Sequence, residues 1–292
     1  MYADLLWGKF MSNVETRLNG LNSCLRLGQN LGRSAYHKLY EFRTSTVWLI
    51  ISMALFLLVW TTAAFLFNNP TLLPLPWAVL EGFFSLIRDG SLIGDIQASL
   101  QRVFVGFLIA SVIGAPLGIF LAYFYVPRQI TVPIITLLRP IPPIAWIPLA
   151  ILWFGIGNAS SYFITAIAAF FPVFINSFAG GRAVDRHHIH AAKCLGAKQT
   201  ALFSKVLLPS ALPLVWAGLR IGLGQSWMAV VTSELIAAQS GLGYMIQANR
   251  LNLETSYVLV GMVTIGILGS LMNAVLGYIE KYIIPWKAEY LH

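Results

Sequence analysis

Long apolar stretches free of charge alternate with short polar ones along the chain. Three windows contain no Asp, Glu, Lys or Arg: residues 44–80, 103–127 and 255–279. Between Arg128 and Arg182 the only charged residue is Arg139. A helix needs about 20 apolar residues to cross a hydrocarbon core of about 30 Å. Because the stretches lack the alternation of a membrane β-barrel, the pattern predicts membrane-spanning helices.

This pattern predicts an all-α membrane protein with six spans. We expect the spans at residues 47–67, 103–125, 133–156, 160–180, 211–236 and 256–279. The first is too long, and begins too far along the chain, for a cleaved signal with an apolar core of ~7–15 residues. We therefore expect one transmembrane domain over residues 47–284, between segments 1–46 and 285–292.

Composition and charge support this class and orient it. The chain is 58% hydrophobic and 10% charged, whereas soluble domains average about 25% charged residues. With the N-terminus inside, residues 1–46, the loop near 128, residues 181–210 and the tail hold six, one, five and two Lys/Arg, fourteen in total. The opposite side holds three. This asymmetry predicts cytoplasmic termini in a cell (inner or plasma) membrane. In a chain of this class we expect the net charge of +8 to interact with membrane lipid and not with nucleic acid.

The first 46 residues are basic and partly amphipathic. Four apolar residues recur at helical spacing there: Val14, Leu18, Leu21 and Leu25. The segment is compatible with amphipathic helices on the inner membrane face or with a partly disordered basic tail.

A basic stretch, HIHAAKCLGAKQTALFSKVLLP at residues 188–209, interrupts the apolar chain. We predict a helix over 186–195, a stop with positive φ at Gly196, and a second helix over 198–208 that Pro209 ends. Two interpretations of this stretch remain open. In one it docks in the cleft of a soluble partner, and in the other it is an interfacial helix that connects spans four and five.

A second unusual stretch, LLRPIPPIAWIP at residues 137–148, breaks an apolar run with four prolines. Irregular backbone at membrane depth is tolerated only beside protein or a watery cavity, and transporter sites use such broken helices. Because Arg139 precedes the break, the pattern favours a lining of a transport path over a kinked packing element. Arg220 is the other arginine within a span, and it lies between Gly218 and Gly222. This pair, like Gly114 and Gly118, is typical of close helix packing.

Several chemical motifs are missing from the sequence. It has no G-x-x-x-x-G-K-[ST] phosphate loop, no G-x-S-x-G and no H-E-x-x-H. His187, His188 and His190 lack the partners of a metal site. We therefore expect a chain that is not an enzyme, with no catalytic residue, metal or cofactor of its own.

The basic stretch also carries a familiar pattern, Ala191-Ala192-x3-Gly196-x9-Val206-x-Leu208-Pro209. It resembles the EAA loop of permease subunits in ATP-binding-cassette (ABC) importers, with His190 where that family usually has Glu. Other segments add to the resemblance: LRPIPPIAWIPLAILWFGIG (138–157), GLRIGLGQSW (218–227) and SELIAAQSGLGYMI (233–246). Over roughly residues 45–287, the chain is similar to the taurine/alkanesulfonate branch of the nitrate–sulfonate–bicarbonate permeases.

The resemblance implies the type I importer (MetI-like) fold and a homodimer with the path at its interface. It also implies two ATPase subunits that bind ATP and Mg, and an extracytoplasmic solute-binding protein. Taurine or a sulfonate would be the favoured solute, with nitrate or bicarbonate as alternatives. The ATPase-coupling residues would be His190, Ala191, Ala192, Gly196, Val206, Leu208 and Pro209.

For the path, the candidates are Arg139, Pro140, Pro142, Pro143, Arg220 and Glu234. Each deep arginine could instead be a structural anchor. A secondary transporter or channel without an ATPase is the main alternative function. The second alternative is a membrane-embedded enzyme. It would need clustered ionisable groups at membrane depth, which this sequence lacks.

Overall fold

The structure, a computed structural model, describes residues 47–286 with the exception of the Arg186 side chain. The chain divides into two compact units, Met1–Asn68 and Asn69–His292. In the first unit the described residues form an apolar helix, Val47–Phe67. The interpretation of residues 1–46, and that of the tail from 287 onwards, lies outside the described residues.

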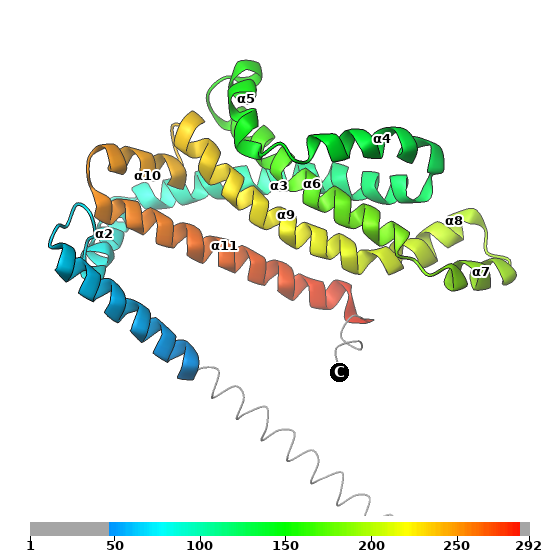
Figure 1. Cartoon of the computed structure of the whole chain (residues 1–292), viewed down its shortest axis with the longest axis horizontal. Coiled ribbons are helices and arrows are strands. Elements are labelled where there is room, and N and C mark those ends of the chain that lie inside the picture. The colour runs from blue at the N-terminus through cyan, green and yellow to red at the C-terminus, as the bar shows by residue number, and fades with distance from the viewer. Residues whose placement is uncertain (1–46, 287–292) are drawn as a thin grey trace, which may run out of the picture. The chain divides into compact units, whose positions relative to one another are not determined.

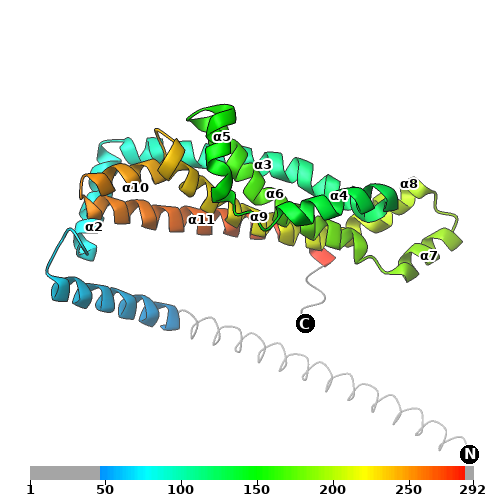
Figure 2. The ribbon, with the colours of Figure 1, turned by 45° about the horizontal axis from the view of Figure 1, so that its top comes forward.

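The described part of the second unit is built from helices, shown in Figures 1 and 2. In chain order they are α2 (Pro76–Arg88), α3 (Ser91–Tyr123), α4 (Tyr125–Leu138), η1 (Pro143–Trp146), α5 (Ile147–Phe154), α6 (Asn158–Arg182), α7 (Arg186–Cys194), α8 (Gln199–Leu202), the π turn η2 (Phe203–Leu207), α9 (Leu208–Ala237), α10 (Leu242–Leu251) and α11 (Thr255–Ile283).

The membrane spans follow the prediction, with one interruption. Five helices are long and apolar enough to cross a membrane: Val47–Phe67, Ser91–Tyr123, Asn158–Arg182, Gln199–Ala237 and Thr255–Ile283. The third expected span is a pair of helices, α4 and η1–α5, bent by 93° at the proline-rich break. The pair gives a sixth span if it is counted as one.

Helix α3 begins well before the expected start of the second span. The sequence places that start at residue 103, where the charge-free window opens, whereas the helix begins at Ser91. The extra turns carry Asp95 and Arg102. Their side chains are satisfied inside the protein, so the helix extends through positions that the charge pattern assigned to an outside segment.

Helix α6 lies between α3 and α9, and glycines bring the three backbones close (Figure 1). A Cβ added at Gly118 would lie 2.6 Å from the carbonyl oxygen of Phe174, and one at Gly218 would lie 2.7 Å from the Cβ of Asn176. No side chain fits at such distances without movement. The predicted close packing at these glycines is therefore confirmed, and both pairs face α6.

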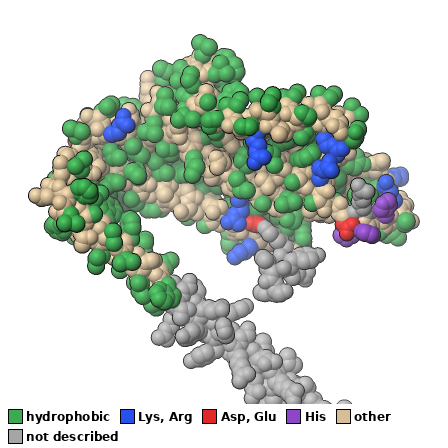
Figure 3. Space-filling view, viewed as in Figure 1, with side chains coloured by type: hydrophobic (Ala, Val, Ile, Leu, Met, Phe, Trp, Pro, Cys, Tyr) green, Lys and Arg blue, Asp and Glu red, His purple; other side chains and the backbone are tan. Residues whose placement is uncertain are grey.

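The outer surface of the second unit is strongly apolar. Figure 3 shows hydrophobic side chains over most of the visible face, with charged and histidine side chains gathered in a few places. Leu137 and Leu152 are each 78% exposed. Apolar surface this extensive is typical of contact with lipid or with another protein chain.

Candidate functional site

The α7–α8 end of the molecule forms a short capped helix that stands beyond the ends of α6 and α9 (Figure 1). Asp185 caps α7, and its carboxylate accepts a hydrogen bond from the backbone N–H of His187 (2.9 Å). This backbone bond, and after it the bond to the His187 imidazole, holds the pKa of Asp185 below its ordinary value. The negative cap also suits the positive end of the helix dipole.

The predicted stop at Gly196 is confirmed. Gly196 has φ +78°, and its N–H donates to the carbonyl of Lys193 (2.9 Å). The N–H of Ala197 donates to the carbonyl of Ala192 (3.0 Å). These two bonds form a Schellman motif, which ends a helix and favours glycine at the left-handed position.

The predicted end of the second helix at Pro209 is wrong. The chain runs as one continuous helix from Gln199 to Ala237, and Pro209 lies in the first turn of α9. The π turn η2 immediately before Pro209 changes the local hydrogen-bond register, so the helix continues through a residue that has no N–H to donate.

The candidate coupling residues lie on or beside this protruding element. His190 and Ala191 are exposed, and Ala192 is half-buried. Further along, Val206 is half-buried and Leu208 is exposed. The neighbouring Leu195 is 88% exposed. The element therefore presents small and apolar side chains that a partner could cover.

The proline-rich break is an exposed corner. Arg139 ends α4, and its N–H donates to the carbonyl of Ile135 (3.0 Å). Pro140 and Pro142 are exposed, and Pro143 is half-buried. Within residues 47–286, the Arg139 guanidinium has neither an ion pair nor a hydrogen bond. The structure therefore gives no support to Arg139 as an internal anchor.

Arg220 lies on the face of α9 that contacts α11. Its Nη1 approaches Oε2 of Glu280 at 3.3 Å, and its Nε donates to Oδ1 of Asn273 at 3.3 Å. Both partners belong to α11. Arg220 also borders a cavity of about 640 Å³ between α9 and α11. The arrangement is compatible with both roles considered for Arg220. Its contacts with α11 suit a structural anchor, and its place beside the cavity suits a lining of the path.

Glu234, the remaining path candidate, lies inside the protein and is only 1% exposed. Arg102 contacts it from α3, with 2.7 Å between Nη1 and Oε1. The Arg102 guanidinium makes five hydrogen bonds, to Glu234, to the Asn158 side-chain oxygen twice, and to the carbonyl and hydroxyl of Ser240. This number equals the donors that an arginine has. Glu234 thus forms a structural pair, and its burial speaks against a lining role.

The same cluster holds the turn between α9 and α10. The Ser99 hydroxyl lies 2.8 Å from each oxygen of Glu234, and the N–H of Gly243 donates to Oε2 of Glu234 (2.9 Å). Oδ1 of Asp95 accepts from the N–H of Gly241 (2.8 Å). We call Asp95, Ser99, Arg102, Asn158 and Glu234 the Glu234 cluster. It ties α3, α6 and α9 to the turn before α10.

Sequence reasoning missed most of this cluster. Arg102 was counted among the charges of an outside segment, although it is 2% exposed. A signal was available, because Asp95, Ser99 and Arg102 follow at spacings of four and three and so share one helix face. The partners lie more than fifty residues away along the chain, so no local pattern could pair them.

Comparison with known proteins agrees with the helical architecture. The family model described as binding-protein-dependent transport system inner membrane component matches residues 114–288. A crystal form of the MetNI methionine ABC transporter in an inward-facing conformation contains a chain of similar fold, with a TM-score of 0.59 and 21% identity. The match covers 67% of this chain and 97% of that one.

Relatives of higher identity cover most of the chain. The taurine transport system permease protein TauC of Escherichia coli is 38% identical, over 82% of this chain and 89% of TauC. The aliphatic sulfonates transport permease protein SsuC of Bacillus subtilis is 36% identical, over 76% of this chain and 80% of SsuC. The nitrate import permease protein NrtB of Leptolyngbya laminosa is 34% identical, over 68% and 71%. The chain is therefore a multi-pass membrane protein that belongs to the taurine/sulfonate/nitrate family of ABC importer permeases.

Proposed function

We propose that two copies of this chain form the translocation path for a small anion, and that separate ATPase subunits drive it. The observation that carries the ATPase part is the α7–Gly196–α8 element. It combines a capped helix, a glycine stop and an exposed small-residue face at the positions where the family places its coupling loop. Since the sequence has no phosphate loop of its own, ATP and Mg would be bound by the partner.

The continuous helix from Gln199 to Ala237 gives a route for the coupling. At 1.5 Å per residue, its 39 residues span about 58 Å. One end joins the α7–α8 element, and the other carries Glu234. Movement of the coupling element by an ATPase would therefore act directly on a helix that reaches the opposite end of the domain, as rigid-body switching requires.

The solute is proposed to be an oxyanion. The relatives are named for the transport of taurine, aliphatic sulfonates and nitrate, and sulfonate and nitrate groups share negatively charged oxygens. Arg139 is exposed at the proline-rich corner and Arg220 borders the α9–α11 cavity. Two such cations on a surface shared by two copies would favour anions without enclosing them.

The orientation follows from the charge asymmetry of the sequence. We place the α7–α8 end and both termini in the cytoplasm, and the α9–α10 turn on the outer side, where a solute-binding protein would deliver the anion. A homodimer would cover part of the exposed apolar surface of α4, α5 and α11. The membrane would be the cell (inner or plasma) membrane.

The proposal is tested by reconstitution in liposomes. The chain is combined with its ATPase and binding protein, and uptake of radiolabelled taurine is measured with ATP inside. We expect uptake that requires all three components and ceases with a non-hydrolysable ATP analogue. Sustained accumulation by this chain alone would contradict the proposal and favour a secondary transporter. With TauC, SsuC and NrtB among the relatives, the same assay with alkanesulfonates and nitrate ranks the solutes.

A further inference from the structure

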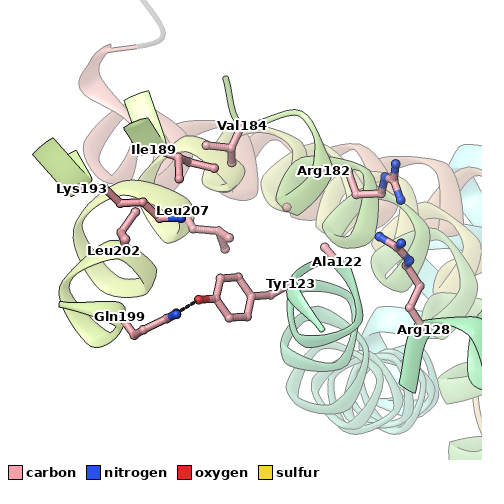
Figure 4. A pocket seen from close by; sticks show the side chains of 11 residues that line it. Ala122, Tyr123, Arg128, Arg182, Val184, Ile189, Lys193, Gln199, Leu202 and Leu207 are labelled. Atoms are coloured by element: carbon pink, nitrogen blue, oxygen red, sulfur yellow. Dashed lines mark hydrogen bonds between the residues drawn. The ribbon is translucent and has the colours of Figure 1, made fainter. Parts of the chain in front are cut away.

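A second pocket lies at the α7–α8 end, behind the coupling element. It has a volume of about 290 Å³ and is shown in Figure 4. Its lining includes Tyr123, Arg128, Arg182, Lys193 and Gln199. The walls come from three places: the α3–α4 junction, the end of α6, and the α7–α8 element. We call it the basic pocket.

Three cations surround this space. Figure 4 shows the guanidinium groups of Arg128 and Arg182 pointing toward one another, with Lys193 reaching in from α7. The lining includes no carboxylate, and in the described part of the chain none of the three forms an ion pair. Like charges that face one another across a small pocket repel, so an anion between them would be stabilised.

Both arginines are positioned before any ligand binds. Arg128 lies over the Tyr125 ring at 5.0 Å, and Arg182 lies 5.9 Å from the Phe178 ring centroid. Such cation–π contacts orient a guanidinium while leaving its N–H donors available. The paired donors of two arginines suit the oxygens of a phosphate group, which they can bind through charge-assisted hydrogen bonds.

The pocket also joins parts that would move relative to one another. Tyr123, at the end of α3, donates a hydrogen bond to the side chain of Gln199 in α8. Leu202 and Leu207, which also line the pocket, are buried. A ligand held by Arg128, Arg182 and Lys193 would therefore link the membrane helices to the α7–α8 element.

We propose that the basic pocket binds the phosphate group of an anionic membrane lipid. Two observations favour a lipid over a free anion. Arg128, which lines the pocket, lies in the first turns of α4, where Val126 and Ile130 are 68% and 65% exposed and offer a surface for acyl chains. The pocket also lies at helix ends that carry Lys198 and Lys205 besides its own three cations, and basic pockets between helices on the cytoplasmic side bind acidic headgroups.

The bound headgroup would hold the α7–α8 element against the ends of α3, α4 and α6. This second step rests on the proposed coupling function, whereas lipid binding does not. We therefore expect anionic lipid both to bind the chain and to increase the ATP hydrolysis that solute and binding protein stimulate.

Lipid binding is tested by native mass spectrometry of the purified chain in detergent with phosphatidylglycerol or phosphatidylcholine. We expect preferential retention of phosphatidylglycerol, weakened about fivefold for each cation removed. The variants are Arg128→Gln, Arg182→Gln and Lys193→Gln. Arg250→Gln, an exposed arginine on α10, is the matched control and should retain lipid normally. Lys193 is exposed, so its variant reports on binding even if an arginine variant fails to fold.

A competition arm distinguishes the source of the anion. If inorganic phosphate binds while phosphatidylglycerol shows no preference over phosphatidylcholine, the site takes free anions and the lipid proposal is overturned. Equal lipid retention by the control and the three variants also overturns it. Lipid retention that appears only with the ATPase present also overturns it, because the pocket of this chain would then not bind the headgroup by itself.

The coupling step is tested in liposomes with and without phosphatidylglycerol, with stimulated hydrolysis as the readout. We expect the lipid to increase hydrolysis in the parent chain and not in Lys193→Gln. Lipid retention without this increase would remove the coupling step and leave the binding site standing. Failure to bind any ATPase would contradict the proposed function, and the retention experiment would still decide the lipid site.

Discussion

The two ends of the transmembrane domain differ in how their charged side chains are buried and paired. At the α9–α10 end, Arg102 and Glu234 are almost fully buried, and the arginine uses five hydrogen bonds within the chain. At the α7–α8 end, Arg128, Arg182 and Lys193 surround a pocket and form no ion pair among the described residues. The charges of the first end are satisfied within the chain, whereas the three cations of the second end have no charged partner in its described part.

This difference in charge pairing predicts that the α9–α10 end determines folding stability and that the α7–α8 end determines coupling to the ATPase. A buried ion pair costs much desolvation and is tolerated only with full hydrogen bonding, so loss of one member leaves a buried charge without a partner. Exposed cations cost little and contribute little until a ligand arrives. Substitutions in the Glu234 cluster should therefore unfold the protein, whereas substitutions at the α7–α8 end should leave it folded and impair its coupling.

The largest effect is expected for Arg102→Met. The variant leaves Glu234 buried without its cation, and breaking such a pair costs about 3–5 kcal/mol. Thermal unfolding in detergent should show a greatly lowered Tm or no folded protein. Arg250→Met, at an exposed position on α10, is the control and should unfold like the parent chain. An unchanged Tm for Arg102→Met would mean that the cluster does not hold the turn.

Gly241→Ala should come second. Gly241 has φ +108°, and an added Cβ would lie 2.4 Å from Oε1 of Glu234 and 2.7 Å from Nη1 of Arg102. The overlap and the strained backbone together should cost about 1–3 kcal/mol. Gly94→Ala on α3 is the matched control, since nothing lies within 4 Å of its added Cβ. Equal stability of the two variants in urea or heat would contradict the close approach.

A third prediction concerns two glycines with similar backbones at opposite ends. Gly196 has φ +78°, Gly90 has φ +74°, and nothing lies within 4 Å of an added Cβ at either. Val at either site should cost about 1–3 kcal/mol of local strain. Only Gly196→Val should abolish solute-stimulated ATP hydrolysis, because it distorts the coupling element. Ala191→Trp should do the same by bulk.

The third prediction fails if Gly90→Val and Gly196→Val reduce stimulated hydrolysis equally. That result would assign the loss to general destabilisation, and the α7–α8 element would be a connector. Normal hydrolysis in both Gly196→Val and Ala191→Trp would lead to the same conclusion.

The smallest effect is expected for Arg139→Gln. An exposed cation attracts a passing anion by about 1 kcal/mol at 4 Å in water, which corresponds to about fivefold in rate or affinity. We expect anion uptake to fall by about this factor, with dimer assembly and basal hydrolysis intact. Uptake at the parent level would reject the lining role, and loss of the dimer would favour an anchoring role between copies.

Much of the fold was accessible from the sequence because its signals are local. Continuous hydrophobicity predicted the spans, the pairs at Gly114/Gly118 and Gly218/Gly222 predicted close packing, and Gly196 predicted a helix stop. Each depends on residues within one or two turns of helix, so no distant partner had to be known.

The errors have equally physical causes. Arg102 was assigned to an outside segment because a charge was taken to mark the end of a span, but distant partners from α6 and α9 bury it. Pro209 was taken to end a helix, whereas the π turn immediately before it shifts the hydrogen-bond register and the helix continues. The proposed lining role of Arg139 depends on a second copy of the chain, and no single sequence contains that geometry.

The central claim is that the α7–α8 end, and not the α9–α10 end, meets the ATPase. Two exposed leucines at the ends of short helices allow a matched test: Leu195 beside α7, 88% exposed, and Leu251 at the end of α10, 71% exposed. A photoreactive amino acid is placed at each in turn, and the assembled transporter is irradiated. We expect a covalent adduct with the ATPase from position 195 and none from position 251. No ATPase adduct from 195, or equal yields from both positions, would contradict the claim.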